Sequence, residues 1–240
     1  MDALPKPGLA IPEETLDPID WSDVRSLSHQ IIDESIGYLR EVRERPVWRE
    51  MPDEVKAAFD DALPRLPMPL SDVYRQVREN VMPYPMGNIH PRFWSWYMGS
   101  SNFTGALADF LAAVQGSNLG GGSHAAALLD NQVVNWCKEM IGFPMTASGT
   151  LVSGGSMANL IALTVARNVK AGADVREDGV AAIEKPLRFY ASDQVHSCHR
   201  KAVEALGMGN KALRRISTDT DLRIDLAALR TAIAEDRAAG

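Results

Sequence analysis

The sequence is poor in the features that mark secreted, zinc-bound or membrane-spanning proteins. Its 240 residues contain only two cysteines, Cys137 and Cys198, which lie far apart and in no CxxC spacing, so a disulfide framework or a zinc site has little support. Charges or glycines interrupt every apolar run well short of a membrane span. The N-terminus MDALPKPGLAIPEE also lacks the basic start and apolar stretch of a signal peptide. We therefore expect reduced thiols, no metal, no membrane contact and a cytoplasmic location.

Clustered positive charge is also missing. The chain has 25 basic and 31 acidic residues, a formal net charge of −6, and no basic run long enough for a nucleic-acid-binding face. Hydrophobic residues make up 45% of the chain, which is enough for one large core or two small ones. The composition predicts a globular protein without a nucleic-acid partner.

Residues 1–19 and 20–82 are expected to form an arm and a helical layer. The arm carries four prolines and no apolar periodicity. Asp20 can cap a first helix with an apolar stripe, and two shorter helices are predicted over 53–63 and 71–81. Helices in so thin a layer cannot bury their stripes alone, so they pack either on the main domain or against a second subunit.

The pattern in residues 83–240 is typical of an α/β domain. A helix from Phe103 precedes the glycine loop GSNLGGGSH (116–124) and a helix over 125–141. Strand and helix then alternate three times, with predicted ranges 149–153 and 156–170, 187–192 and 195–206, and 212–217 and 225–238. Alternating units of this length favour a mainly parallel sheet flanked by helices.

The stretch GTLVSGGSMANLIAL, residues 149–163, carries the most information about function. It predicts a short buried strand, a tight turn at Gly154 and Gly155, and a helix with Ser156 near its start. The first N–H groups of such a helix have no internal partner and, with the positive end of the helix dipole, favour an anion such as phosphate. The alternative is an ordinary strand-to-helix turn whose small residues serve packing.

A second unit of the same kind follows about thirty residues later. Residues 187–191 are predicted as a strand, and SDQVHSCHRKA then opens a helix, which places His196 at the edge of the sheet. A lone histidine at a strand end is commonly a hydrogen-bonded structural residue. His199, three residues further along, fits that structural role.

Taken together, SGGSMANLIALTVAR (153–167) and YASDQVHSCHRKA (190–202) resemble the group II pyridoxal-phosphate decarboxylases, the aromatic-L-amino-acid and glutamate decarboxylase group. HPRFWSWY (90–97) and VVNWCKEMIGFP (133–144) fit the same family in order and spacing. The resemblance implies the N-terminal portion of such an enzyme. Residues 20–82 would clasp a second subunit in a homodimer, and 83–240 would form an incomplete large domain of the fold type I, aspartate-aminotransferase-like class.

The resemblance also implies roles for individual residues. Gly155 and Ser156 would hold the phosphate of pyridoxal 5'-phosphate, and His196 would stack on its ring and pass a proton. The substrate, an L-amino acid that loses its carboxyl group, would contact Trp96, Tyr97 and Asn118. The chain departs from the aromatic-amino-acid branch at Met98-Gly99 and in SHAAALLD (123–130), so the resemblance leaves the substrate open.

The lysine expected to bond the cofactor is not identified in this chain. In the family resembled, a later segment supplies an aspartate for the pyridinium nitrogen and a His-Lys pair whose lysine forms the Schiff base. None of the seven lysines stands in that context, and Lys201 falls where the family pattern uses no such lysine. The last helical pattern stops at Gly240, where a return strand is expected. We therefore expect the 240 residues alone to form no covalent bond with the cofactor and to be inactive.

Two functions of other classes stay open. GGSMA is one residue short of the G-x-S-x-G elbow, which would make Ser156 the nucleophile of a serine hydrolase with His196 or His199 as its base. Its last glycine is replaced by alanine, and no HGGG-like segment precedes it. The second is a non-catalytic truncated homologue that binds a full-length subunit through its N-terminal helices.

Overall fold

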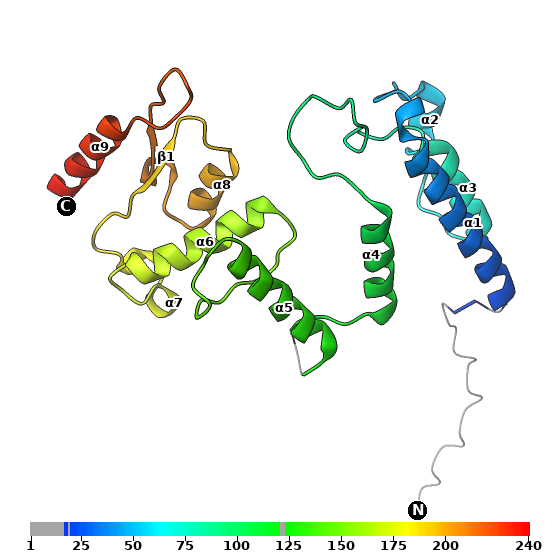
Figure 1. Ribbon diagram of the computed structural model, residues 1–240, viewed down its shortest axis with the longest axis horizontal. Coiled ribbons are helices and arrows are strands. Elements are labelled where there is room, and N and C mark those ends of the chain that lie inside the picture. Colours follow the sequence, from blue (N-terminus) through cyan, green and yellow to red (C-terminus); the bar gives the residue numbers. More distant parts are fainter. Residues whose placement is uncertain (1–16, 19, 121–122) are drawn as a thin grey trace, which may run out of the picture. The chain divides into compact units, whose positions relative to one another are not determined.

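The computed structural model describes residues 17, 18, 20–120 and 123–240 (Figure 1). It divides into two compact units, Met1–Ser117 and Asn118–Gly240, which we call unit 1 and unit 2 and describe separately. The predicted arm, residues 1–19, lies almost entirely outside the described residues. The division into two units reflects contacts within this chain alone. It does not test the domain boundary expected at 82/83, which stays a prediction.

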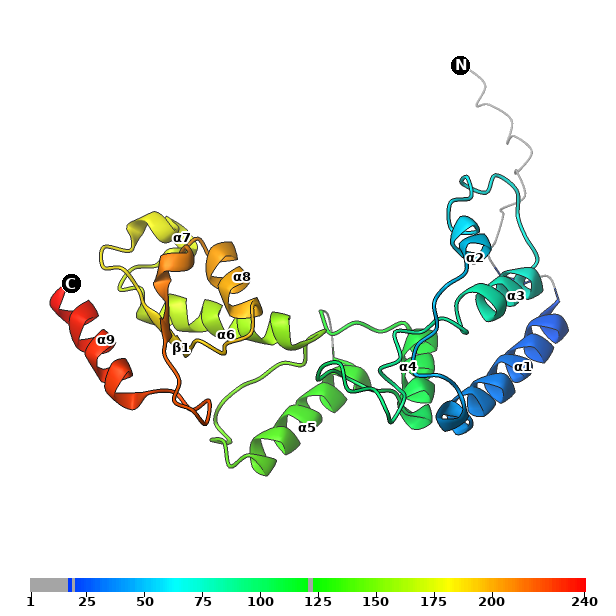
Figure 2. The same cartoon turned by 90° about the horizontal axis from the view of Figure 1, so that it is seen from above.

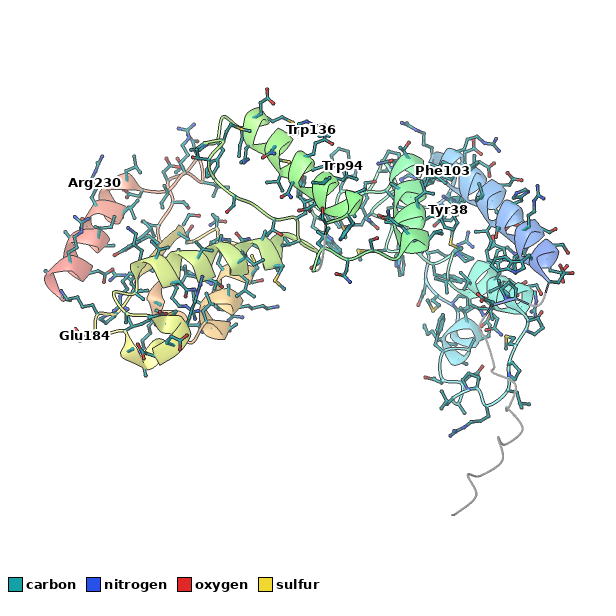
Figure 3. All side chains as sticks on the ribbon, turned by 90° about the horizontal axis from the view of Figure 1, so that it is seen from below. Tyr38, Trp94, Phe103, Trp136, Glu184 and Arg230 are labelled. Carbon is teal, nitrogen blue, oxygen red and sulfur yellow. The ribbon has the colours of Figure 1, made fainter. Side chains whose placement is uncertain are left out.

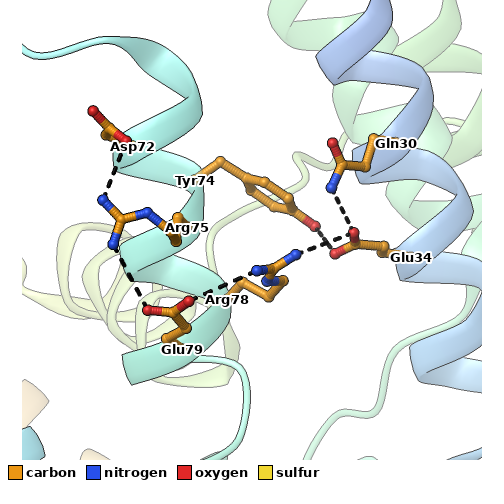
Figure 4. A network of polar contacts seen from close by, with 7 residues as sticks. All are labelled: Gln30, Glu34, Asp72, Tyr74, Arg75, Arg78 and Glu79. Carbon is orange, nitrogen blue, oxygen red and sulfur yellow. Dashed lines mark hydrogen bonds and ion pairs between the residues drawn. The ribbon is translucent and has the colours of Figure 1, made fainter.

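Unit 1 is built from helices joined by long irregular segments. Its helices are α1 (Trp21–Arg40), the short 3-10 helix η1 (Val42–Glu44), α2 (Asp53–Ala57), α3 (Leu70–Asn80) and α4 (Phe103–Gln115). Figures 1 and 2 show α1 and α3 side by side, and Figure 4 shows the polar contacts that join them. The Tyr74 hydroxyl donates to Glu34 Oε2 at 2.6 Å, and Arg78 Nη1 lies 3.6 Å from Glu34 Oε1. Polar contacts thus fix α3 against α1, since neither helix has a fully buried residue.

Capping residues define both starts and one end among the helices α1 and α4 of unit 1. As predicted, Asp20 accepts a hydrogen bond at the start of α1, from the Ser22 N–H at 2.8 Å. Asn102 caps α4 in the same way, and Gly116, whose φ of 65° favours glycine, is the residue that follows the last turn of α4 and caps it.

Helix α2 is shorter than the predicted range 53–63, because it ends at Ala57. Asp60 and Asp61 would place carboxylates at the carboxyl end of a longer helix, where they oppose the helix dipole. Pro64 also disfavours a helical conformation at the residue before it.

Unit 2 contains a small parallel sheet with helices around it. Its elements are α5 (Ala125–Met140), α6 (Gly155–Lys170), α7 (Val175–Asp178), η2 (Val180–Ala182), β1 (Phe189–Ser192), α8 (Cys198–Ala205), η3 (Asn210–Ala212), β2 (Leu213–Ile216) and α9 (Leu226–Ala238). Strands β1 and β2 pair in parallel, with Phe189 opposite Leu213 and Ser192 opposite Ile216. Helix α8 lies in the connection between them, so this part is the predicted strand, helix and strand unit.

The core of unit 2 lies where α8 meets α6 and the strands, and Figures 1 and 2 both show α6 beside α8. Val203 of α8 is fully buried, and Leu206 and Ile216 are buried with it. Polar contacts attach α9 to this core. Asp236 accepts a hydrogen bond from the Tyr190 hydroxyl at 2.7 Å and pairs with Arg214 at 2.5 Å, which links α9 to both strands.

Two predicted elements of unit 2 need correction. Residues 149–153 do not form a strand. Their backbone has no neighbouring strand among the described residues, and a strand exists only where such a neighbour completes its hydrogen bonds. The helix predicted over 195–206 begins later, at Cys198, because residues 193 and 194 form a turn after β1 and His196 lies in the connection.

Within the described part of the chain, no helix has the length and apolar character needed to cross a membrane. The same residues bring together no group of three His, Cys, Asp or Glu side chains that could hold a metal ion.

Candidate functional site

The predicted phosphate turn lies at the start of α6. Met157 and Ala158 both donate their N–H groups to the Gly154 carbonyl oxygen at 3.1 Å. The N–H groups of Gly155 and Ser156 have no hydrogen-bond partner among the described residues, and no side chain caps the helix. The turn therefore offers two backbone donors and the exposed Ser156 hydroxyl to an anion.

The two glycines of this turn provide space. Nothing lies within 4 Å of the position that a Cβ would take at Gly154 or Gly155. The backbone at Gly154 is extended, with φ of 161°, so the predicted tight turn does not depend on a conformation reserved for glycine. A side chain at either position would instead fill the space in front of the helix.

His196 is oriented by the start of α8. Its Nδ1 accepts a hydrogen bond from the Cys198 N–H at 3.2 Å. Because Nδ1 is the acceptor, the ring carries its proton on Nε2. His196 is exposed, so Nε2 is available to a ligand, whereas His199 Nδ1 lies 3.5 Å from Cys198 Sγ and 3.3 Å from the His196 carbonyl oxygen.

The first turns of α6 and α8 are joined by a contact that the sequence did not indicate. Asn159 Nδ2 donates to Cys198 Sγ at 3.4 Å. Ser156, Cys198 and Lys201 line one cavity of about 230 Å³ between the two helices. Lys201 is exposed, and its place in the lining of this cavity adds a positive charge beside Ser156. The only sequence signal for Asn159 is its place three residues after Ser156, on the same helix face.

Asp193 and Thr218 mark the carboxyl edge of the sheet. The Asp193 N–H donates to the Ile216 carbonyl oxygen at 2.8 Å, which extends the contact between the two strand ends. Asp193 Oδ1 accepts hydrogen bonds from the Gln194 amide at 3.0 Å and the Thr218 hydroxyl at 3.1 Å. These hydrogen bonds, that of Gln194 foremost, hold the pKa of the Asp193 carboxyl below its usual value. The edge next to His196 therefore carries an ionised carboxylate.

The predicted substrate-contacting aromatics belong to unit 1. The Phe93 and Trp96 rings meet edge to face with centroids 5.4 Å apart, and Trp96 Nε1 lies 3.2 Å from Met98 Sδ. Trp96 is 60% exposed and Tyr97 fully exposed, and Trp94, labelled in Figure 3, is 89% exposed. These aromatic side chains do not form a core within unit 1.

Asn118 lies in unit 2, at the start of the glycine loop. Its Oδ1 accepts a hydrogen bond from the Gly120 N–H at 2.8 Å, so the side chain shapes the loop. The loop residues 121 and 122 lie outside the described part of the chain. His124 follows them and carries a buried Nδ1 with no partner among the described residues.

A serine hydrolase requires a hydrogen bond between the nucleophile and its base. Among the described residues, Ser156 Oγ makes no hydrogen bond to His196 or His199. The Nδ1 atoms of both histidines contact the Cys198 segment instead.

The chain is similar to proteins of one family. Residues 52–240 match the family described as pyridoxal-dependent decarboxylase conserved domain. The chain is 34% identical over 223 residues to the aromatic-L-amino-acid decarboxylase of Bacillus atrophaeus, covering 91% of this chain and 44% of that protein. It is 28% identical over 241 residues to tyrosine decarboxylase 2 of Narcissus pseudonarcissus, covering 95% of this chain and 47% of that protein.

Solved structures agree with these sequence matches. The structure of Oryza sativa TDC with PLP and tryptamine has a TM-score of 0.79 and 26% identity, over 94% of this chain and 48% of that one. Rhodiola rosea 4-hydroxyphenylacetaldehyde synthase has a TM-score of 0.78 and 25% identity, over 93% of this chain and 49% of that one. The chain thus spans about half the length of the relatives it matches. These similarities confirm the predicted fold class.

Proposed function

Because this chain belongs to the pyridoxal-dependent decarboxylase family, we propose that it forms the front part of the cofactor site of an enzyme that removes the carboxyl group of an L-amino acid. The cofactor of this family is pyridoxal 5'-phosphate. The observation that carries the proposal is the open turn at the start of α6, held beside the His196 segment by the contact of Asn159 with Cys198. The names of the relatives favour an aromatic amino acid as the substrate.

The residues of the α6 turn fit the phosphate of this cofactor. Gly155 and Ser156 offer unpaired N–H groups, Ser156 adds a hydroxyl, and the absence of side chains at positions 154 and 155 leaves room for the phosphate oxygens. The positive end of the α6 dipole and the nearby ammonium of Lys201 both favour an anion there. We assign phosphate binding to Gly155 and Ser156 on these grounds.

His196 is the catalytic residue in this proposal. When bound, the cofactor supplies an electron-accepting ring for the charge that the loss of carbon dioxide leaves on the α carbon. His196 would stack against that ring and would hold or move a proton at Nε2, while the Cys198 N–H keeps Nδ1 engaged. The hydrogen bond to Nδ1 fixes both the tautomer and the direction of the imidazole.

Trp96, Tyr97 and Asn118 are proposed to contact the substrate side chain. The exposed faces of the two aromatics suit an apolar or aromatic side chain, which would cover surface that unit 1 leaves in water. Asn118 adds a polar group whose position the Gly120 N–H sets.

We also propose that the enzyme is a cytoplasmic homodimer that residues 20–82 clasp. Helices α1, α2, α3 and α4 contain no fully buried residue. Large apolar side chains on and between them are exposed, among them Trp21 at 65%, Leu66 at 83% and Val114 at 69%. Tyr38 and Phe103, labelled in Figure 3, line an apolar groove of about 420 Å³ between α1 and α4. A second subunit would remove this surface from water.

The variant Ser156→Asp tests the phosphate assignment. Its affinity for pyridoxal phosphate is compared with that of the parent chain in a titration followed by absorbance. A carboxylate about 4 Å from a phosphate of charge about −2 costs about 2 kcal/mol in water, so affinity should fall about 30-fold. Ser71→Asp is the matched control, because Ser71 is also exposed and is also the second residue of its helix, α3. Unchanged affinity in Ser156→Asp, or an equal loss in both variants, contradicts the assignment. Labelling of Ser156 by a fluorophosphonate would indicate the serine hydrolase instead.

A further inference from the structure

Unit 1 contains a second pocket whose lining residues are not part of the proposed cofactor site. It has a volume of about 280 Å³ and lies between the end of α1, η1, the segment 45–49 and the segment 82–90. Val42, Val47, Met82 and Ile89 give it an apolar lining. Its size suits a small molecule, since a cavity of about 150 Å³ already accommodates benzene.

His90 lines this pocket and carries an unpaired hydrogen-bond donor. The residue is 5% exposed, and its Nδ1 accepts a hydrogen bond from the Arg92 N–H at 3.0 Å. Because Nδ1 is the acceptor, the ring proton lies on Nε2. Nε2 is buried and has no partner among the described residues. A buried donor without a partner costs free energy, so an occupant of this pocket gains by presenting an acceptor to it.

The charged residues that line the pocket are all positive. Arg45 donates to the Tyr38 carbonyl oxygen and lies over the Tyr38 ring, 3.4 Å from its centroid. Arg78 is balanced by Glu34 and Glu79, as Figure 4 shows. Arg49 has no ion pair among the described residues, and no acidic residue lines the pocket. The lining therefore favours an anion: among the described residues neither Arg45 nor Arg49 has a carboxylate partner, and Arg49 makes no contact of the kind that engages Arg45.

From these observations we propose that the pocket binds a small organic acid with one carboxylate and an apolar body. One carboxylate oxygen accepts the proton of His90 Nε2, and the negative charge pairs with Arg49. The hydrocarbon or aromatic body contacts Val42, Val47 and Ile89. An inorganic anion would satisfy the charges but leave the apolar lining in water, and a neutral molecule would leave Arg49 unpaired. The proposal stands independently of the proposed decarboxylase function, because all of its residues lie between positions 38 and 90.

The test is a titration of the whole chain with phenylacetate, followed by calorimetry and by the NMR signal of the His90 ring nitrogens. We expect saturable binding that shifts the His90 Nε2 signal and that weakens at least tenfold in His90→Phe and in Arg49→Met. Arg43→Met is the matched control, because Arg43 is an exposed arginine of the neighbouring η1 and does not line the pocket. Binding in Arg43→Met and in Ser156→Asp should equal that of the parent chain.

The comparison compounds are 2-phenylethanol, which lacks the charge, and inorganic phosphate, which lacks the apolar body. Both should bind at least tenfold more weakly than phenylacetate. Three results overturn the proposal. They are no shift of the His90 signal, equal losses of affinity in Arg49→Met and Arg43→Met, or an affinity for 2-phenylethanol or inorganic phosphate that equals the affinity for phenylacetate. Circular dichroism shows whether His90→Phe is folded. If it is not, Arg49→Met decides the outcome, because Arg49 is an exposed side chain.

Discussion

Replacing Val203 by alanine should loosen the part of unit 2 that carries His196. Val203 lies in α8, is 0% exposed, and is the largest fully buried side chain among the described residues. The substitution removes two methyl groups, whose transfer to water costs about 1.6 kcal/mol at about 0.8 kcal/mol each. The cavity left behind adds about 1 kcal/mol at about 24 cal/mol per Å³. We expect the free energy of opening of β1, α8 and β2 to fall by about 2 to 3 kcal/mol.

Amide hydrogen exchange of peptides from β1, α8 and β2 measures this change without assuming that both units unfold together. A loss of about 2 kcal/mol corresponds to exchange about 30-fold faster. Val169→Ala makes the same chemical change on α6 at a side chain that is 71% exposed, and its effect should stay within about 0.5 kcal/mol. Equal effects of the two variants, or less than a threefold change in Val203→Ala, would refute the claim that Val203 anchors this core.

Two further predictions concern unit 1. Burial, and next the hydrogen bond to Glu34, raise the pKa of Tyr74 to about 12 from 10.0. Because this folded-state pKa lies above the unfolded one, the stabilisation from Tyr74 is complete below about pH 10 and is lost as the pH rises from 10 to 12. Phenolate absorbance should show a titration step near pH 12 that Tyr74→Phe removes; a step that persists in the variant belongs to another tyrosine. Deletion of residues 20–81 should leave aggregated or poorly soluble protein, and a soluble, well-folded monomer in sedimentation would show that the clasp proposal is wrong.

The helices of this chain are largely predictable because their signals are local. Asp20 and Asp225 each accept backbone hydrogen bonds at a helix start, and Gly116 ends α4 in a left-handed conformation. The segment 149–153 illustrates the limit. Its apolar residues resemble a strand, but a strand depends on a neighbour that no local pattern specifies. Helix α2 shows a second limit. The apolar periodicity predicts a helix that continues past Ala57 to residue 63, but the structure ends the helix before Asp60 and Asp61.

The candidate site divides in the same way. An open helix start at Gly155 and Ser156 follows from residues adjacent in sequence, and the structure contains it. The contact of Asn159 with Cys198 joins two helices far apart in sequence, so no local signal predicts it. In the sequence, His90 is only the first residue of an aromatic motif. The burial of its Nε2 could not be predicted, because it depends on how segments 45–49 and 82–90 fold together.

The direct connection of β1 to β2 through α8 also has a consequence for the order in which the chain acquires structure. Phe189 pairs with Leu213 across a connection that contains α8 and η3, so closing this contact costs less chain entropy than pairing strands from more distant parts of a sequence. The fully buried Val203 lies within the same stretch, so its burial and the pairing of the two strands occur together. We expect β1, α8 and β2 to reach their native arrangement as one unit once residue 216 has been synthesised. The imidazole of His196 would then be held by the Cys198 N–H before any ligand arrives.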